Sequence, residues 1–385
     1  MALNRFSKTS YRFGIELYEN FISDDDNYPQ NIVFSPFLVQ IALSTILMGA
    51  VGKTFEEIGV VLKYGKNCKK AQVAYQFHEM MLQIKKEGGL MINNEIFVQR
   101  GYNLHAAFLN ITKNCFDARV TKIDFNNKDS AVEEINKYVE NNTNGAIKDV
   151  VSSEDIKEFT RALAVNTIYF KGAWRKPFDV YSTRKMPFWT TTTEYSDVDM
   201  MVQRNRFAYG TLEKLDVTVI ELQYNQSDVS MMIFLPNKKD GLKILEDGLK
   251  KLDLDFVRSQ MQKDHVALYL PKFKFEFTQD LEKVLKSLGM KAAFEEDLAD
   301  FRHLKDPNDD ETFFVSKIVH KAFIKVDEAG TEAAAAVRII LCGGGPSPTY
   351  RPFVADHPFM FMLVLNNFMM FAGVVNDPAD FLESD

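Results

Sequence analysis

The stretch AGTEAAAAVRIILCGGGPSP, residues 329–348, decides which fold we predict for this chain. Read at a period of two residues, one face of it is wholly small or apolar, and the other face carries both charges. The first face consists of Thr331, Ala333, Ala335, Val337, Ile339 and Leu341. This alternation predicts a half-buried strand. The same residues also make a passable short helix, because alanine is the best helix former.

The flanking segments favour a strand with an unusual property. The segment before it, AFIKVDEAG, is a strand that ends at Gly330, and the segment after it, CGGGPSPTY, is a loop of glycines and prolines. A strand with small inward side chains can slide between two strands that are already paired, whereas bulky side chains would clash with the close-packed interior. The sequence therefore predicts a segment with two states, an exposed loop and an added strand.

Length and charge limit the possible function. The chain has 385 residues and a net charge of -7, and no Pro/Gly/Ser-rich linker divides it. The acidic balance argues against a general nucleic-acid binder, which would carry a basic footprint. Lys66, Lys69 and Lys70 form the only local basic cluster, which we interpret as a solvated face. We expect no heparin-like cofactor to be needed at this cluster.

The cysteines, sequons and apolar runs leave the compartment open. Three cysteines, at positions 68, 115 and 342, give neither a disulfide framework nor metal-ligand spacing. No signal peptide is visible, while three N-glycosylation sequons, at positions 110, 141 and 225, are weak evidence for secretion. Both a secreted and a cytoplasmic location remain open. The longest apolar run, residues 359–375, predicts two buried strands that turn at Asn366-Asn367, with no membrane span.

The distribution of patterns predicts the fold class. The first third is mostly helical: Phe13, Leu17 and Phe21, for example, recur at the spacing of one helical face. Strand-like segments dominate the rest, including residues 161–170, 217–224, 229–236, 266–277 and 317–328. Because helices and strands are largely separated along the chain, we predict an α+β fold with large sheets rather than regular βαβ units.

Six motifs in sequence order carry a resemblance to a known family. They are NIVFSPF (31–37), VNTIYFKGAW (165–174), LPKFKFE with DLEKVLKSLGM (270–276 and 280–290), VHKAFIKVDEAGTEAAAA (319–336), HPFMF (357–361) and FAGVVNDP (371–378). Together they resemble the serpins, the serine protease inhibitor superfamily. The resemblance covers nearly the whole chain and implies a single serpin domain, residues 1–385, with a helix-rich N-terminal part, a large mixed central sheet and a reactive-centre loop at about residues 328–352.

The resemblance also implies roles for particular residues. The hinge of the loop consists of Glu328, Gly330, Thr331, Ala333, Ala334, Ala335 and Ala336. Trp174 marks the breach, where the loop enters the sheet, and the shutter contains His320 with Ser35 and Asn166 as its hydrogen-bond partners. From the residues alone, Trp174 and His320 are equally well explained as core packing. We expect no catalytic residue, metal or cofactor, and no nucleic-acid partner.

Three functional classes remain in competition. The resemblance implies an inhibitor that acts as a monomeric suicide substrate: the protease forms an acyl-enzyme with the loop, and the cut loop inserts and drags the enzyme away. A non-inhibitory carrier, chaperone or storage protein is the alternative, but such members break the hinge pattern, which is intact here. An ordinary enzyme is disfavoured because no nucleophile elbow, paired carboxylates, metal cluster or phosphate loop is present.

The bond that a protease attacks stays open. In the family, the residue before that bond lies sixteen after the hinge glutamate, which gives Gly344–Gly345 and an elastase-like target that tolerates small residues. A shift to Leu341–Cys342 or Cys342–Gly343 suits a chymotrypsin-like or a cysteine protease. A target that needs a basic residue would have to use Arg338 or Arg351.

Three departures from the family pattern concern the shutter and one turn. Leu38 stands where the family usually has a second shutter serine, and Tyr138 stands where a helix usually carries a tryptophan. The turn at Asn366-Asn367 is shorter than usual. These differences concern the shutter and one turn, and the prediction of the fold does not depend on them.

Overall fold

The computed structural model describes residues 2–23, 30–87, 89–143, 145, 147–157, 160, 162–306, 313–331 and 348–379. The chain divides into two compact units, each assembled from separate segments. The first comprises Met1–Phe21, Phe34–Tyr169 and Thr278–Ala322, and the second Ile22–Val33, Phe170–Phe277 and Phe323–Asp385. The expectation of a single domain stays a prediction.

The first unit holds most of the helices. They are α1 (Ala2–Ser23), α2 (Pro36–Gly49), α3 (Gly52–Val61), α4 (Lys70–Ile84), α5 (Ala106–Phe116), α6 (Lys128–Asn142) and α9 (Leu281–Ser287). Phe13, Leu17 and Phe21 are all buried on one face of α1, as their spacing predicted. Helix α2 is buried on nearly every side, because its sequence is apolar all round. Its first turn is capped by Ser35, whose Oγ accepts a hydrogen bond from the Leu38 amide at 3.0 Å.

The second unit contains a nine-stranded sheet in the described part of the chain. Its order is β1-β16-β15-β9-β8-β7-β10-β14, with β6 paired to β7. The bounds are β1 (Ile32–Phe34), β6 (Arg184–Trp189), β7 (Tyr195–Leu212), β8 (Val217–Gln223), β9 (Val229–Pro236), β10 (Met261–Pro271), β14 (Arg351–Val354), β15 (Phe359–Leu365) and β16 (Phe368–Val375). Two short helices, α7 (Leu242–Gly248) and α8 (Leu254–Ser259), lie between β9 and β10 in sequence.

The predicted C-terminal hairpin is confirmed. Strands β15 and β16 pair antiparallel and turn at Asn366 and Asn367, whose φ angles of 47° and 67° lie in the left-handed region. Asparagine tolerates this conformation better than most residues, which explains the two-residue turn. Across the described residues, no helix combines the length and apolar character needed to cross a membrane.

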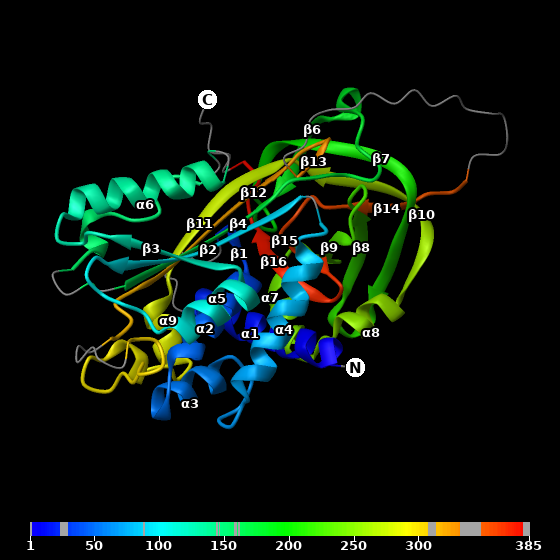
Figure 1. Cartoon of the computed structure of the whole chain (residues 1–385). Coiled ribbons are helices and arrows are strands. Elements are labelled where there is room, and N and C mark those ends of the chain that lie inside the picture. The colour runs from blue at the N-terminus through cyan, green and yellow to red at the C-terminus, as the bar shows by residue number, and fades with distance from the viewer. Residues whose placement is uncertain are drawn as a thin grey trace. The chain divides into compact units, whose positions relative to one another are not determined.

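The other sheet, which contains Gly330 and Thr331, has seven strands in the described residues, in the order β3-β2-β4-β12-β13-β5, with β11 on β12 (Figure 1). Its bounds are β2 (Leu90–Gln99), β3 (Ala118–Ile123), β4 (Ala162–Phe170), β5 (Gly172–Ala173), β11 (Phe273–Asp280), β12 (Ile318–Val326) and β13 (Gly330–Thr331). The start of β12 pairs in parallel with β4, with Ile318 opposite Ala164 and Ala322 opposite Ile168. Helices and large sheets in separate parts of the chain confirm the α+β class.

Candidate functional site

The first residues after the hinge glutamate are already part of the sheet. Gly330 and Thr331 form β13, which pairs antiparallel with β12 on one side and with β5 on the other. In this register Thr331 lies opposite Val326 and opposite Gly172. Gly330 and Thr331 are therefore strand residues, and the preceding strand ends at Val326, and not at Gly330 as predicted. Of the strand that the alternating pattern predicts at 331–341, only Thr331 lies in the described residues. Residues 332–347 of that stretch, which include Ala333–Ala336 and the proposed scissile positions 341–345, lie outside the described residues.

Gly330 is required by the close approach of β5. Its φ is 157°, and a Cβ atom added at this position would lie 2.0 Å from the carbonyl oxygen of Gly172. Only glycine leaves room for two backbones at this distance. At Gly330 the hinge backbone therefore passes β5 so closely that no side chain would fit between them.

Thr331 points into the interior, as the small and apolar face predicted. It is 3% exposed, and its hydroxyl lies 2.6 Å from the phenol oxygen of Tyr224, which is itself 1% exposed. Burial raises the pKa of Tyr224 far above its usual value, so the phenol stays neutral and able to donate. The two hydroxyls therefore satisfy each other in an otherwise apolar site.

Trp174 packs directly over this pair. Its ring stacks on Tyr224 with a centroid distance of 4.5 Å and an angle of 17°, and its Nε1 donates to the carbonyl oxygen of Asp327 at 3.0 Å. Its backbone amide donates to the carbonyl oxygen of Ala329 at 2.9 Å. Trp174 therefore contacts the residues on both sides of Glu328, and its role at the breach stays a prediction.

The Glu328 side chain is buried, and both of its carboxylate oxygens have partners. One carboxylate oxygen accepts from the Thr183 hydroxyl at 2.8 Å, and the other lies 3.1 Å from Lys272 Nζ. Burial on its own raises the pKa of Glu328, but the bonds from Thr183 and Lys272 lower it by more, so the net shift is downward. The hinge glutamate is thus an anchored anion and not a free surface charge.

The predicted shutter residues lie in the first unit. His320 on β12 is 1% exposed, and its Nε2 accepts a hydrogen bond from the Ser35 backbone amide at 3.1 Å. Burial lowers the pKa of His320 to about 4, so the ring is neutral at physiological pH. Asn166 lies opposite His320 in the β4–β12 register, yet its Oδ1 is buried with no hydrogen-bond partner in the described structure. Ser35 is thus a partner through its backbone, and Asn166 is a neighbour that no side-chain bond joins to His320.

The two departures at the shutter have local explanations. Leu38 is fully buried in the first turn of α2, where its amide donates to the Ser35 Oγ that caps the helix. Tyr138 keeps an aromatic ring against Phe97, at 5.7 Å in a T-shaped arrangement, and its hydroxyl donates to Glu95 at 2.7 Å. The Tyr138 hydroxyl therefore adds a hydrogen bond between α6 and β2.

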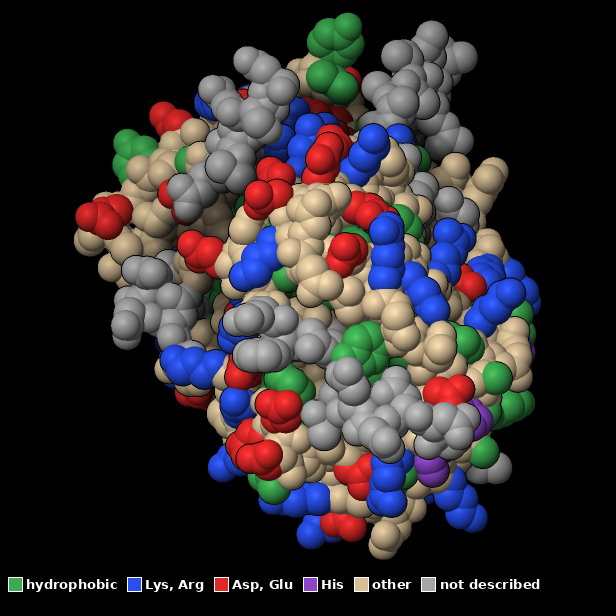
Figure 2. Space-filling model, turned by 60° about the vertical axis from the view of Figure 1, so that its left-hand side comes forward, with side chains coloured by type: hydrophobic (Ala, Val, Ile, Leu, Met, Phe, Trp, Pro, Cys, Tyr) green, Lys and Arg blue, Asp and Glu red, His purple; other side chains and the backbone are tan. Residues whose placement is uncertain are grey.

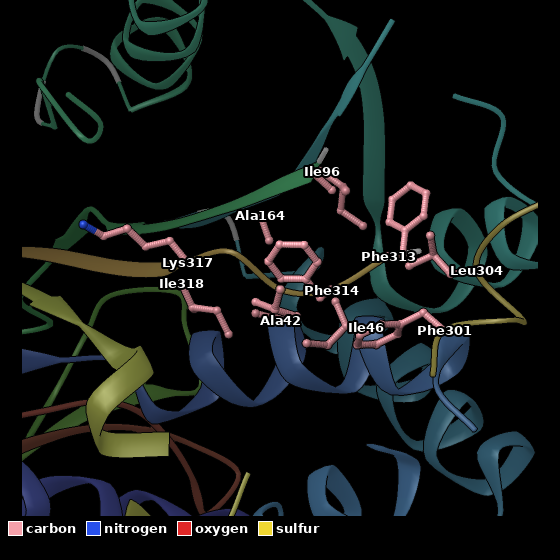
Figure 3. Close-up of a pocket in the computed structure, with 12 residues that line it drawn as sticks. Ala42, Ile46, Ile96, Ala164, Phe301, Leu304, Phe313, Phe314, Lys317 and Ile318 are labelled. Atoms are coloured by element: carbon pink, nitrogen blue, oxygen red, sulfur yellow. The ribbon is translucent and has the colours of Figure 1, made fainter. Parts of the chain in front are cut away.

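A small apolar cavity lies under the start of β4 and β12, in the first unit. Its volume is about 50 Å³. Figure 3 shows Ala42 and Ile46 of α2 on one side and Ala164 and Ile96 on the other, with the Phe314 ring between them and the Lys317 ammonium pointing away. Ala164 and Ile318, which pair with each other, both line it. The lining is apolar, so a cavity of this size has no polar groups that would hold water.

Sequence reasoning missed the partners that complete this site. Tyr224, Thr183 and Lys272 come from three separate segments, and no local pattern marks them. Tyr224 only appeared as the last residue of a predicted strand. In the described residues no group of three or more His, Cys, Asp or Glu side chains could hold a metal ion.

Comparison with known proteins agrees with this architecture. The family model described as Serpin (serine protease inhibitor) matches residues 8–378, so the chain belongs to the serpin family. Serine protease inhibitor 42Dd of Drosophila melanogaster is 35% identical over 366 residues, which cover 94% of this chain and 95% of that protein. The structure of cleaved Serpin 42Da matches with a TM-score of 0.88 at 32% identity, over 98% of this chain and 99% of that one. Human thyroxine-binding globulin also matches, with a TM-score of 0.88 at 29% identity, over 98% of this chain and 100% of that one.

Proposed function

We propose that this protein inhibits a protease as a suicide substrate, by inserting its cut loop between β4 and β12. The observation that carries the proposal is the position of Thr331. It is already paired on both sides and faces inward, so the next residues of the loop need only continue a strand that has begun. The stretch that follows has the small inward residues that such an insertion requires.

The register of β13 predicts where the inserted loop would end. Counting eight residues on from Thr331 gives Ile339, and counting eight back from Val326 and Gly172 gives Ile318 and Ala164. Ile318 and Ala164 pair with each other now and line the apolar cavity. An inserted strand in unbroken register therefore separates this pair and directs Ile339 into the cavity.

The order of side-chain sizes along the loop fits this path. The first inward residues after Thr331 are alanines, which pass easily, while Ile339 and Leu341 come last and are large. Burying each of these two side chains contributes about 1.5–3 kcal/mol, and each new backbone hydrogen bond adds about 1 kcal/mol net. The uncut form must then be metastable, with free energy that cleavage releases.

The target follows from the same loop. If Gly344–Gly345 is the bond attacked, an elastase-like serine protease is favoured, because the bond offers no side chain to fill a pocket. If the bond is Leu341–Cys342 or Cys342–Gly343, a chymotrypsin-like or cysteine protease is favoured. We propose that the inhibitor acts as a monomer, since the mechanism needs one loop and one sheet.

The test is to cut the loop and remelt the protein. Limited proteolysis anywhere between residues 341 and 345 should raise the thermal midpoint by tens of degrees, and mass spectrometry of the released fragment identifies the bond. A panel of elastase-like, chymotrypsin-like and cysteine proteases should yield one complex that survives boiling in detergent. An unchanged midpoint after cutting would contradict both insertion and inhibition.

The runner-up is a non-inhibitory serpin that binds a small molecule. The close structural match to thyroxine-binding globulin supports it. A protein of this kind would give no detergent-stable complex with any protease of the panel. The complex would be absent even if the cut loop inserted and raised the thermal midpoint. Protease trapping together with the midpoint shift therefore distinguishes the two functions.

A further inference from the structure

A hollow of about 370 Å³ in the second unit, next to Trp174, gathers positive charge from three separate segments. Arg175 and Lys176 follow β5, Arg206 lies on β7, and Lys263 lies on β10. These segments lie far apart in the sequence, so no run of basic residues indicates that the four side chains meet. We call these four residues the basic hollow.

Two of the four cations are hydrogen-bonded to neutral side chains and not to carboxylates. Arg175 donates to the Gln223 amide oxygen at 2.8 Å, and Lys176 Nζ donates to the Asn205 side chain. Among the residues that the structure describes, none of the four cations forms an ion pair. Among the described residues that line the hollow, Glu221 is the one carboxylate, and it is already ion-paired with Arg258 at 2.9 Å.

The four cations are close enough to repel each other. The pKa of Lys176 is lowered first by partial burial and then by the charges of Arg175, Lys263 and Arg206. Collecting like charges without counter-ions is unfavourable, and it is unexpected in a chain whose net charge is -7. Over the lower and left-hand parts of the face drawn in Figure 2, Asp and Glu side chains lie among those of Lys and Arg.

The local cluster seen in the sequence is a useful contrast. Lys70 donates to the carbonyl oxygens of Met48 and Ala50 at 2.9 and 2.6 Å, so it caps the end of α2 and is not part of a solvated face. Lys66 and Lys69 are exposed. That cluster therefore leaves two free lysines, whereas the basic hollow presents four cations to one space.

We propose that the basic hollow is a binding site for a compact polyanion, a small molecule that carries several phosphate or sulfate groups. Its volume suits such a ligand, its charges lack protein counter-ions, and the Gln223 and Asn205 amides lie among the cations. The site does not depend on the proposed inhibition. Because Arg175 directly follows Trp174, an anion in the hollow lies beside the segment that holds the hinge, and Trp174 fluorescence can report it.

The experiment measures anion binding to the full chain in a Trp189→Phe background, which leaves Trp174 as the only tryptophan. Inorganic tripolyphosphate and sucrose octasulfate are titrated separately, at low ionic strength and again near 1 M salt, where the Debye length falls to about 3 Å. We expect saturable binding that high salt abolishes. Binding of one probe alone identifies phosphate or sulfate as the preferred group, and binding of both supports the shared chemistry.

Two variants and a control make the site specific. The triple variant Lys176→Gln, Arg206→Gln, Lys263→Gln should weaken binding at least about tenfold, which corresponds to 1.4 kcal/mol. Lys263→Glu alone should also weaken binding, because the Lys263 side chain makes no hydrogen bond or ion pair with the described residues that the change would remove. The control variant Lys66→Gln, Lys69→Gln, Lys86→Gln removes the same net charge from exposed sites and should bind as the parent does. Absence of binding to both probes, or equal weakening in control and triple variant, overturns the proposal.

Discussion

The hinge site and the shutter are both buried, but they differ in how their polar groups are satisfied. At the hinge, the Thr331 hydroxyl, the Trp174 indole and the Glu328 carboxylate all have partners within about 3 Å. At the shutter, His320 holds only the Ser35 amide through Nε2, and the Asn166 oxygen is buried without a partner. An unsatisfied buried oxygen costs about 1–3 kcal/mol.

The difference teaches where each part of the proposed mechanism is controlled. The hinge is held by specific side-chain bonds, so access to the sheet depends on particular residues. At the shutter, β4 and β12 must part, and no side-chain bond between Asn166 and His320 has to break when they do. Changes at the hinge should therefore alter function most, while changes at the shutter should alter stability.

The largest expected effect is that of Thr331→Arg. A guanidinium at this inward position must be buried without a counter-charge or keep the strand out of the sheet. Insertion then slows, the acyl-enzyme hydrolyses first, and the inhibitor becomes a substrate. The measurement is the fraction of protease trapped in a detergent-stable complex, with Thr331→Val, which stays small, as the control. Equal trapping by Thr331→Arg and the parent would show that inward size at this position does not matter.

Removing the breach aromatic should come next. Trp174→Ala deletes the stacked ring and the bond to Asp327, and should cost about 3–5 kcal/mol of the free energy of unfolding. Because the same ring holds the hinge, incubation just below the midpoint should also let the intact loop enter, giving an inactive form with a higher midpoint. Trp189→Ala, which removes the other tryptophan, should not do this. Inactivation by simple unfolding would leave Trp174 as core packing alone.

The cavity gives a prediction that separates the two faces of the loop. Ile339→Ala should lower the free energy of unfolding of the cut form by about 2–5 kcal/mol, because its side chain fills the cavity only after insertion. The uncut form should be unchanged. Ile340→Ala is the matched control, since its side chain points to the other face. If the two variants behave alike, the register that places Ile339 opposite Ile318 and Ala164 is wrong.

Local patterns were enough to predict the class of fold and the inward position of Thr331. The helical spacing of Phe13, Leu17 and Phe21, the turn at Asn366-Asn367 and the inward face that begins at Thr331 all follow from side-chain periodicity. These features depend on neighbours a few residues apart, which a single sequence contains in full.

What the sequence could not show depends on contacts between distant segments. Tyr224 meets Thr331 across 107 residues, and Lys176 and Arg206 share a hollow only because β5 and β7 are brought together. The role of Lys70 as a helix cap was missed for the same reason, since its partners precede it by about 20 residues. Motif resemblance pointed to Trp174 and to His320 with Ser35 beside it. It did not point to Tyr224 or to the Asp327 carbonyl, which Trp174 contacts.

The smallest expected effect is a pH dependence that comes from His320. In the unfolded chain a histidine has a pKa near 6.5, and in the fold burial lowers that of His320 to about 4. Between these two values only the unfolded state takes up the proton, so the free energy of unfolding falls as the pH falls from about 6.5 to 4. At pH 5, which lies about 1.5 units below the unfolded-state pKa, this proton uptake lowers the free energy of unfolding by about 2 kcal/mol.

The matched variant is His320→Gln, which keeps an acceptor for the Ser35 amide but cannot titrate. Denaturant unfolding of the parent and of His320→Gln at pH 7 and pH 5 isolates this contribution, because all other titrating groups are common to both proteins. The parent should lose about 2 kcal/mol more than the variant over this interval. Equal losses would mean that His320 is protonated as easily in the fold as in the unfolded chain. That result would be incompatible with a dry shutter in which Nε2 accepts a hydrogen bond from the Ser35 amide at the start of α2.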